Sequence, residues 1–179
     1  MGLLLGMLLS CFIPQQHSIS GVKTIAVVET FTIGPPVQRA TWQMNPRIRV
    51  CESTTLSMFR TQKAIKYWEK LGYDFDGVSI DYNIDCMRPR YGEIIITLPE
   101  GNIDSKHMAA TRIYTEKVTG NIAKVKIFIY PKDAMLPRVI EHEIGHALGW
   151  MHYSQRYHIM HPNWHLGGDD GRGLRKRID

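Results

Sequence analysis

The chain of 179 residues has few of the features that mark unusual protein classes. Three cysteines are too few for a disulfide-dense mini-scaffold, and 44% hydrophobic with 22% charged residues excludes wholesale disorder and collagen-like repeats. There is no internal repeat and no low-complexity stretch. The excess of 22 Lys and Arg over 17 Asp and Glu is small and spread out, so it does not indicate binding to nucleic acid. At this length we expect one compact domain.

The first twenty residues have no charged side chain, and an apolar run from Leu3 to Ile13 is shorter than the roughly 20 residues that span a bilayer. This pattern predicts that residues 1–20 are a secretory signal peptide cleaved before Gly21, so that the protein is secreted or extracytoplasmic without a stable membrane span. Because the run is not preceded by Lys or Arg, two alternatives stay open. They are an apolar N-terminal segment packed on the domain and a lipid anchor at Cys11.

Two cysteines remain after such a cleavage, Cys51 and Cys86. They form a disulfide or stay as two buried thiols, and the sequence leaves both open. Residues 21–46 contain a Val-, Ile- and Thr-rich run, Lys23 to Thr32, followed by a Gly-Pro-Pro turn. We interpret this segment as an N-terminal extension that adds a strand, or as a short pro-segment. The main domain is expected to begin at residue 47.

From Arg47 the hydrophobic pattern predicts one helix among several strands. The helix is expected to start at an N-cap on Ser53 and to end at Gly72. A turn signal at Gly120 indicates that the last two strands form an antiparallel pair. The order predicts an α+β or mixed α/β domain with one twisted sheet. The expected strands are residues 47–51, 78–83, 93–98, 108–115 and 125–130.

Residues with catalytic chemistry are concentrated in one segment, which reads H-E-x-x-H from His142 to His146 and continues x-x-G-x-x-H to His152. On a helix, His142 and His146 are separated by about 6 Å along the axis and about 40° around it, so both imidazoles point to one spot. That spot suits a Zn²⁺ ion. Glu143 lies beside the metal, where its carboxylate can accept a proton from zinc-bound water.

Helix geometry explains why this motif contains a glycine. An uninterrupted helix would carry His152 about 15 Å beyond His142, out of ligand range. Gly149 can adopt the left-handed conformation at the helix C-terminus and turn the chain back toward the metal. Three neutral histidines leave one coordination position open, which is typical of a catalytic zinc site.

This segment resembles the metzincin metallopeptidases, and among them the matrixins, whose third histidine is followed by a Met-containing turn. Here that turn is Ile159-Met160-His161-Pro162. The resemblance implies that Met160 forms an apolar floor under the metal. It also implies a twisted, mostly parallel sheet of about five strands with one antiparallel edge strand, a backing helix, an active-site helix and a small C-terminal subdomain. Residues 47–179 would be the catalytic domain, and extended substrate would pair with residues 108–115.

The chain departs from the matrixin pattern in three ways. His107 is the only histidine between Gly21 and the motif, so we expect structural zinc or calcium ions to be absent or different. No Cys-switch peptide is found in the sequence. A final helix after Asp170 would be short. The other late histidines are interpreted as solvated or cleft-lining, with a second metal cluster as the alternative; they are His158, His161 and His165.

These observations predict a zinc-dependent metalloendopeptidase that binds one catalytic Zn²⁺ through His142, His146 and His152 and uses Glu143 as general base. The alternative is a non-catalytic, zinc-containing domain for peptide binding or adhesion. Glu143 contributes nothing to metal ligation, so its presence favours the enzyme. We expect a protein or peptide substrate, no nucleic acid, and a monomer.

Overall fold

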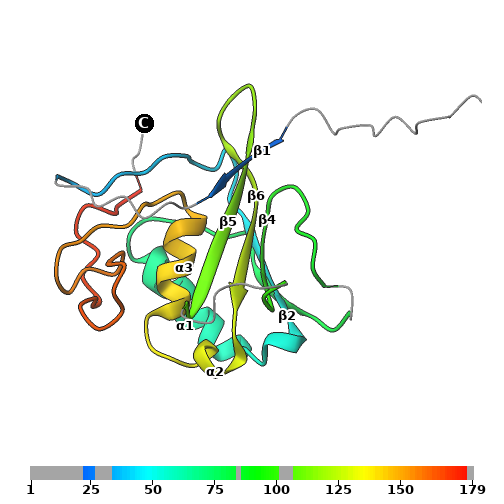
Figure 1. Cartoon of the computed structure of the whole chain (residues 1–179). Coiled ribbons are helices and arrows are strands. Elements are labelled where there is room, and N and C mark those ends of the chain that lie inside the picture. Colours follow the sequence, from blue (N-terminus) through cyan, green and yellow to red (C-terminus); the bar gives the residue numbers. More distant parts are fainter. Residues whose placement is uncertain (1–21, 27–33, 84–85, 101–106, 177–179) are drawn as a thin grey trace, which may run out of the picture.

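The computed structural model describes residues 22–26, 34–83, 86–100 and 107–176. These residues form a mixed α/β fold in which one six-stranded sheet packs on one face against two helices (Figure 1). The predicted signal peptide, residues 1–20, lies outside the described residues. The strands are β1 (Val22–Ala26), β2 (Arg47–Cys51), β3 (Val78–Asp81), β4 (Glu93–Thr97), β5 (Ala109–Glu116) and β6 (Ile122–Ile129). The helices are η1 (Glu52–Thr54), α1 (Met58–Glu69), α2 (Pro131–Ala134) and α3 (Val139–Ala147).

The sheet has the order β1-β5-β6-β4-β2-β3 and is parallel from β6 to β3. Every residue of β4 is buried, as is typical of an inner strand of a parallel sheet covered on both faces. Strand β5 is antiparallel to β6, which confirms the predicted pair, and β1 is antiparallel to β5. The prediction of a mostly parallel, mixed sheet is therefore confirmed.

The edge of the sheet differs from the prediction. Residues 108–115 were expected at the antiparallel edge, but β1 adds a sixth strand outside β5 and pairs with residues 112–116. Strand β1 satisfies backbone groups that an edge strand would leave open. Among the described residues, Ala109–Thr111 at the start of β5 is paired with β6 only.

Helix α1 begins later than predicted. Its N-cap is Ser57, whose hydroxyl accepts a hydrogen bond from the backbone N–H of Arg60. The cap predicted at Ser53 is wrong because that residue lies in the short helix η1, and Thr55 with φ 58° separates η1 from α1. A left-handed residue cannot continue a right-handed helix. The predicted C-terminal end is confirmed, since α1 ends at Glu69 shortly before Gly72.

Buried contacts between α1 and α3 set the position of α3. The indole N–H of Trp68 donates to the carbonyl of Glu141 at 2.8 Å. The guanidinium of Arg60 forms two hydrogen bonds with the carboxylate of Glu141, at 2.8 and 2.6 Å, and both side chains are buried. Removing one partner of such a pair leaves an uncompensated buried charge. Glu141 therefore anchors α3 one residue before the H-E-x-x-H segment begins.

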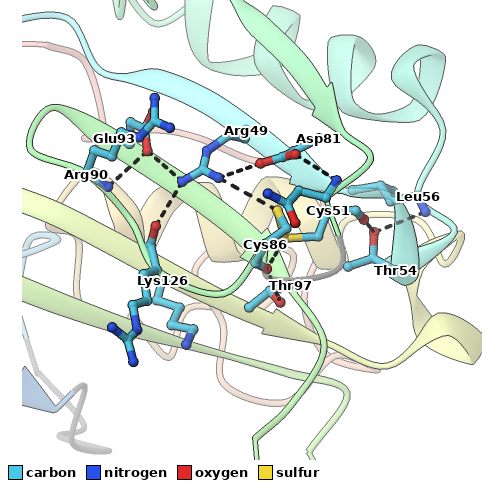
Figure 2. The surroundings of a disulfide bond; sticks show 12 residues. Arg49, Cys51, Thr54, Leu56, Asp81, Cys86, Arg90, Glu93, Thr97 and Lys126 are labelled. Carbon is cyan, nitrogen blue, oxygen red and sulfur yellow. Dashed lines mark hydrogen bonds and ion pairs between the residues drawn. A yellow bond between two sulfur atoms is a disulfide. The ribbon is translucent and has the colours of Figure 1, made fainter.

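Cys51 and Cys86 form a disulfide, with their Cα atoms 5.6 Å apart. Figure 2 shows Arg49 beside it, between Asp81 and Glu93. The guanidinium donates to Asp81 at 2.6 Å and to Glu93 at 2.9 Å, which ties β2 to its two neighbours. Closing a loop with a sequence separation of 35 stabilises the fold by about 3–4 kcal/mol in the chain-entropy model. Of the two alternatives that the sequence left open, the structure has the disulfide.

The C-terminal part of the described chain is a folded loop. Leu174 is fully buried in the core, and Lys176 donates its backbone N–H to the carbonyl of Leu71. The helix predicted after Asp170 does not form within residues 171–176, where Gly171 and Gly173 raise the cost of helical backbone. Among the described helices, none is long and apolar enough to cross a membrane.

Candidate metal centre

Three imidazoles converge in the cleft between α3 and the loop that follows it. The Nε2 atom of His152 lies 3.3 Å from that of His142 and 3.1 Å from that of His146. Tetrahedral zinc with bonds of 2.0–2.1 Å would separate its nitrogen ligands by about 3.3–3.4 Å, so the donor set fits this ion. In the described part of the chain this is the one group of three or more such side chains that could hold a metal ion.

Backbone carbonyls orient two of these rings. The Nδ1 atom of His142 is 2.7 Å from the carbonyl oxygen of Ile159, and Nδ1 of His146 is 2.7 Å from that of Trp150. A carbonyl only accepts, so each Nδ1 carries the proton and each Nε2 keeps its lone pair for a cation. The rings are therefore held in the tautomer that a metal requires.

Gly149 makes the turn that brings His152 back to the helix. Helix α3 ends at Ala147, and Gly149 has φ 94°, a conformation that side chains with a Cβ rarely adopt. A Cβ at this position would also lie 1.9 Å from the carbonyl oxygen of Ala40. The turn thus requires glycine for its backbone conformation and for the close approach of the Ala40 carbonyl. The sequence indicated the first of these two reasons.

A segment far away in the sequence caps the end of α3. The side chains of Gln38 and Trp42 donate to the carbonyls of Leu148 and Ala147, at 2.8 and 2.9 Å, and Arg39 donates its backbone N–H to Gly149. The last carbonyls of a helix need such partners. Nothing in the local sequence signals these contacts, because the partners are more than 100 residues apart.

Met160 lies directly against the helix that carries the histidines. It is fully buried, and a Cβ added to Gly145 would lie 2.3 Å from its sulfur and 2.7 Å from the ring of Trp68. Gly145 was not singled out from the sequence. The available signal was a glycine inside a helix, which costs about 1 kcal/mol relative to alanine and is often explained by close packing.

Glu143 is buried in the same cleft, with 6% of its surface exposed. The hydroxyl of Thr111 on β5 donates to its Oε2 at 2.5 Å. Burial raises the pKa of this carboxyl to about 7, and the hydrogen bond from Thr111 opposes the increase. A carboxyl with a pKa near neutrality can both take up and release a proton at physiological pH.

A cavity of about 310 Å³ adjoins the three histidines and Glu143. Its apolar wall includes Met108, Val139, Pro162 and Trp164. The guanidinium of Arg138 lies 4.8 Å from the ring centre of Trp164, which connects the start of α3 to the far side of this wall. The cavity therefore combines a polar centre with an apolar chamber, as small-ligand and substrate sites commonly do.

The remaining late histidines do not form a second metal cluster in the described chain. His161 is buried and lines the cavity, in agreement with the interpretation as a cleft residue. His158 is fully buried, and its ring nitrogens contact the carbonyl of Arg172 and the backbone N–H of Met160. It is therefore a loop-supporting residue and not a solvated one. His165 is exposed.

The metal-free protein is expected to be most stable near pH 6.5. Burial lowers the pKa of His142 to about 4 and that of His146 well below its usual value. The ordinary pKa values are 4.5 for glutamate and 6.5 for histidine. Between these two pH values the unfolded chain carries a proton on each of the two histidines and none on Glu143. The folded chain carries one proton, on Glu143. Stability then rises with pH across this interval and falls above it as Glu143 ionises.

Urea unfolding of the protein in excess chelator, followed between pH 4.5 and 8, checks this expectation. The expectation would be contradicted if the urea concentration at the unfolding midpoint increased steadily as the pH drops below 6.5.

No protein-family model, curated protein or solved structure matches this chain. The functional assignment must therefore come from the geometry of the site. That geometry comprises a three-histidine cluster, a buried carboxyl beside it and a cavity that both adjoin.

Proposed function

We propose that this protein is a secreted, zinc-dependent metalloendopeptidase. The observation that carries the proposal is the convergence of three Nε2 atoms at zinc-ligand spacing, next to a buried glutamate in an open-sided cleft. Structural zinc sites usually fill all four positions with protein ligands, whereas this cluster offers three. The resemblance to metzincins supports the same conclusion through the motif and the Met160 turn.

The protein's residues divide the work of hydrolysis. His142, His146 and His152 would hold the zinc ion, which when bound activates a water molecule and polarises the scissile carbonyl. Glu143 takes a proton from the attacking water as the new C–O bond forms. It then gives that proton to the amide nitrogen as the C–N bond breaks, so the carboxylate is regenerated at the end of the cycle.

Supporting roles follow from the contacts around the cluster. Gly149 returns the chain so that His152 reaches the other two ligands, and Met160 packs beneath α3 as the apolar floor. An extended peptide would pair with β5 at Ala109–Thr111, which lines the cavity, and add a short strand. Strand β1 already pairs with residues 112–116, so that part of β5 is not available to a peptide.

The location and domain organisation are part of the same proposal. A disulfide is typical of proteins that fold in an oxidising compartment, which supports an extracytoplasmic enzyme. Residues 1–20 would be the signal peptide and residues 47–179 the catalytic domain. Residues 37–42 cap the active-site helix, so they would stay with that domain even if residues before them were removed.

Removal and return of the metal test the proposed activity. The full-length mature protein is expected to cleave a quenched-fluorescence peptide library, to lose that activity in a zinc chelator, and to recover it when zinc is added after dialysis. Elemental analysis should show about one zinc per chain in the active preparation. The control is the same protein held at the same pH without chelator.

Two outcomes would contradict the proposal. Cleavage that persists after all zinc is removed would point to a contaminating or metal-independent protease. A protein with full zinc that binds peptides but cuts none would instead favour a non-catalytic peptide-binding domain.

A further inference from the structure

Thr111 lies on the face of β5 that packs against α3. Residues 111, 113 and 115 alternate inward along this strand, and all three are buried, with exposed fractions of 8%, 4% and 3%. The middle residue is the apolar Ile113, whereas the outer two are threonines. Thr111 thus places a hydroxyl group in a buried layer that also contains an apolar side chain.

This hydroxyl contacts the candidate general base. It donates to Oε2 of Glu143 at 2.5 Å, and its oxygen lies 3.3 Å from the backbone carbonyl of the same residue. Thr111 also lines the cavity that contains the three histidines. The contact joins two elements that are 32 residues apart in sequence, so it is made only when β5 and α3 are packed together.

We propose that Thr111 is a positioning residue for the general base, holding the Glu143 carboxylate in the orientation from which it accepts and returns the proton. This inference rests on the proposed function. It adds a residue outside the H-E-x-x-H segment to the machinery of the site.

The glutamate side chain is free to adopt several orientations. Three rotatable bonds separate its carboxylate from the backbone, so the helix alone does not determine where the oxygens point. A hydrogen bond from a neutral hydroxyl to a carboxylate is short and stronger than one between neutral groups. It engages Oε2 alone, and the second oxygen is then directed at the reacting proton. Preorganisation of this kind lowers the barrier without changing substrate binding.

The Thr111→Val variant distinguishes a positioning role of Thr111 from a purely structural one. Valine keeps the β-branched shape and packing of threonine but lacks the hydroxyl. Serine keeps the hydroxyl and lacks the methyl group. Thr115 provides a matched control on the same strand and face, because its hydroxyl is directed to the carbonyl of Lys23, 3.4 Å away, and not to the active site.

The experiment compares wild type with Thr111→Val, Thr111→Ser and Thr115→Val by steady-state cleavage of one quenched peptide, by zinc content and by thermal unfolding. Thr111→Val is expected to lower kcat about tenfold with KM and zinc content close to those of wild type, and to lower the unfolding temperature by a few degrees because a buried acceptor loses its donor. Thr111→Ser should recover most of the lost kcat, and Thr115→Val should retain wild-type kcat.

The outcomes separate this inference from the proposed function. If wild type is active and Thr111→Val keeps wild-type kcat, the positioning role is wrong while the peptidase assignment stands. The role is also wrong if Thr111→Ser is as impaired as Thr111→Val, or if Thr115→Val loses the same activity. A zinc-loaded wild type that cuts no peptide overturns both.

Discussion

Replacing Glu143 by alanine or glutamine is expected to abolish peptide cleavage while leaving the metal in place. General acid–base catalysis contributes about 10²- to 10⁴-fold, and the loss in kcat should fall in that range or exceed it. Zinc binding should persist because neither the three Nε2 atoms nor the carbonyls that hold Nδ1 of His142 and His146 involve the Glu143 side chain. Turnover of a quenched peptide and elemental analysis of the same samples provide the two measurements.

Stability gives an independent readout for the Glu143→Gln variant. Because burial raises the pKa of Glu143 in the folded protein, ionisation of its carboxyl above pH 7 opposes folding. The neutral amide removes this cost, so in excess chelator the metal-free variant should be at least as stable as metal-free wild type at pH 8. An enzyme with undiminished kcat after either substitution would remove Glu143 from the mechanism.

Replacing His146 by alanine is expected to eliminate both zinc and activity. His146 is the buried member of the cluster, and its Nε2 lies 3.1 Å from that of His152. Loss of an outer-shell partner alone weakens metal binding 10- to 100-fold, so loss of a direct ligand should cost at least about a hundredfold in affinity. Zinc titration against a competing chelator measures this directly, and activity should disappear in parallel.

The matched control is His165→Ala. His165 is exposed, belongs to the loop after the Met160 turn, and is outside the three-histidine cluster. It should retain wild-type zinc affinity and kcat. If the His165 and His146 variants lost zinc equally, the assignment of the ligand set would be wrong.

Comparison of prediction and structure shows which features are local. The strands β2 and β4 and the β5–β6 pair could be predicted because alternation, β-branched residues and turn signals are properties of short segments. The start of α1 could not, since Ser53 and Ser57 are both acceptable caps by composition. The backbone conformation of residues 52–55 decided between them, because Thr55 is left-handed and separates η1 from α1.

The neighbour of β1 could not be predicted. Its run of Val, Lys, Thr and Ile indicated a strand, but a strand's neighbour depends on which sheet edge is open in the folded molecule. Pairing with residues 112–116 moved the edge of the sheet outward along that part of β5. Residues 112–115 of the expected substrate strand are therefore paired with β1.

By itself, the sequence determined which three imidazoles converge and where they do so. Their convergence depends only on helical periodicity and one glycine turn, and both follow from residue spacing within eleven residues. Tertiary structure alone decided what surrounds them. Trp68 and Met160 close on Gly145, residues 37–42 cap the end of α3, and Thr111 reaches Glu143 from β5. These contacts join segments that are 15 to more than 100 residues apart, and only packing of the whole chain brings them together.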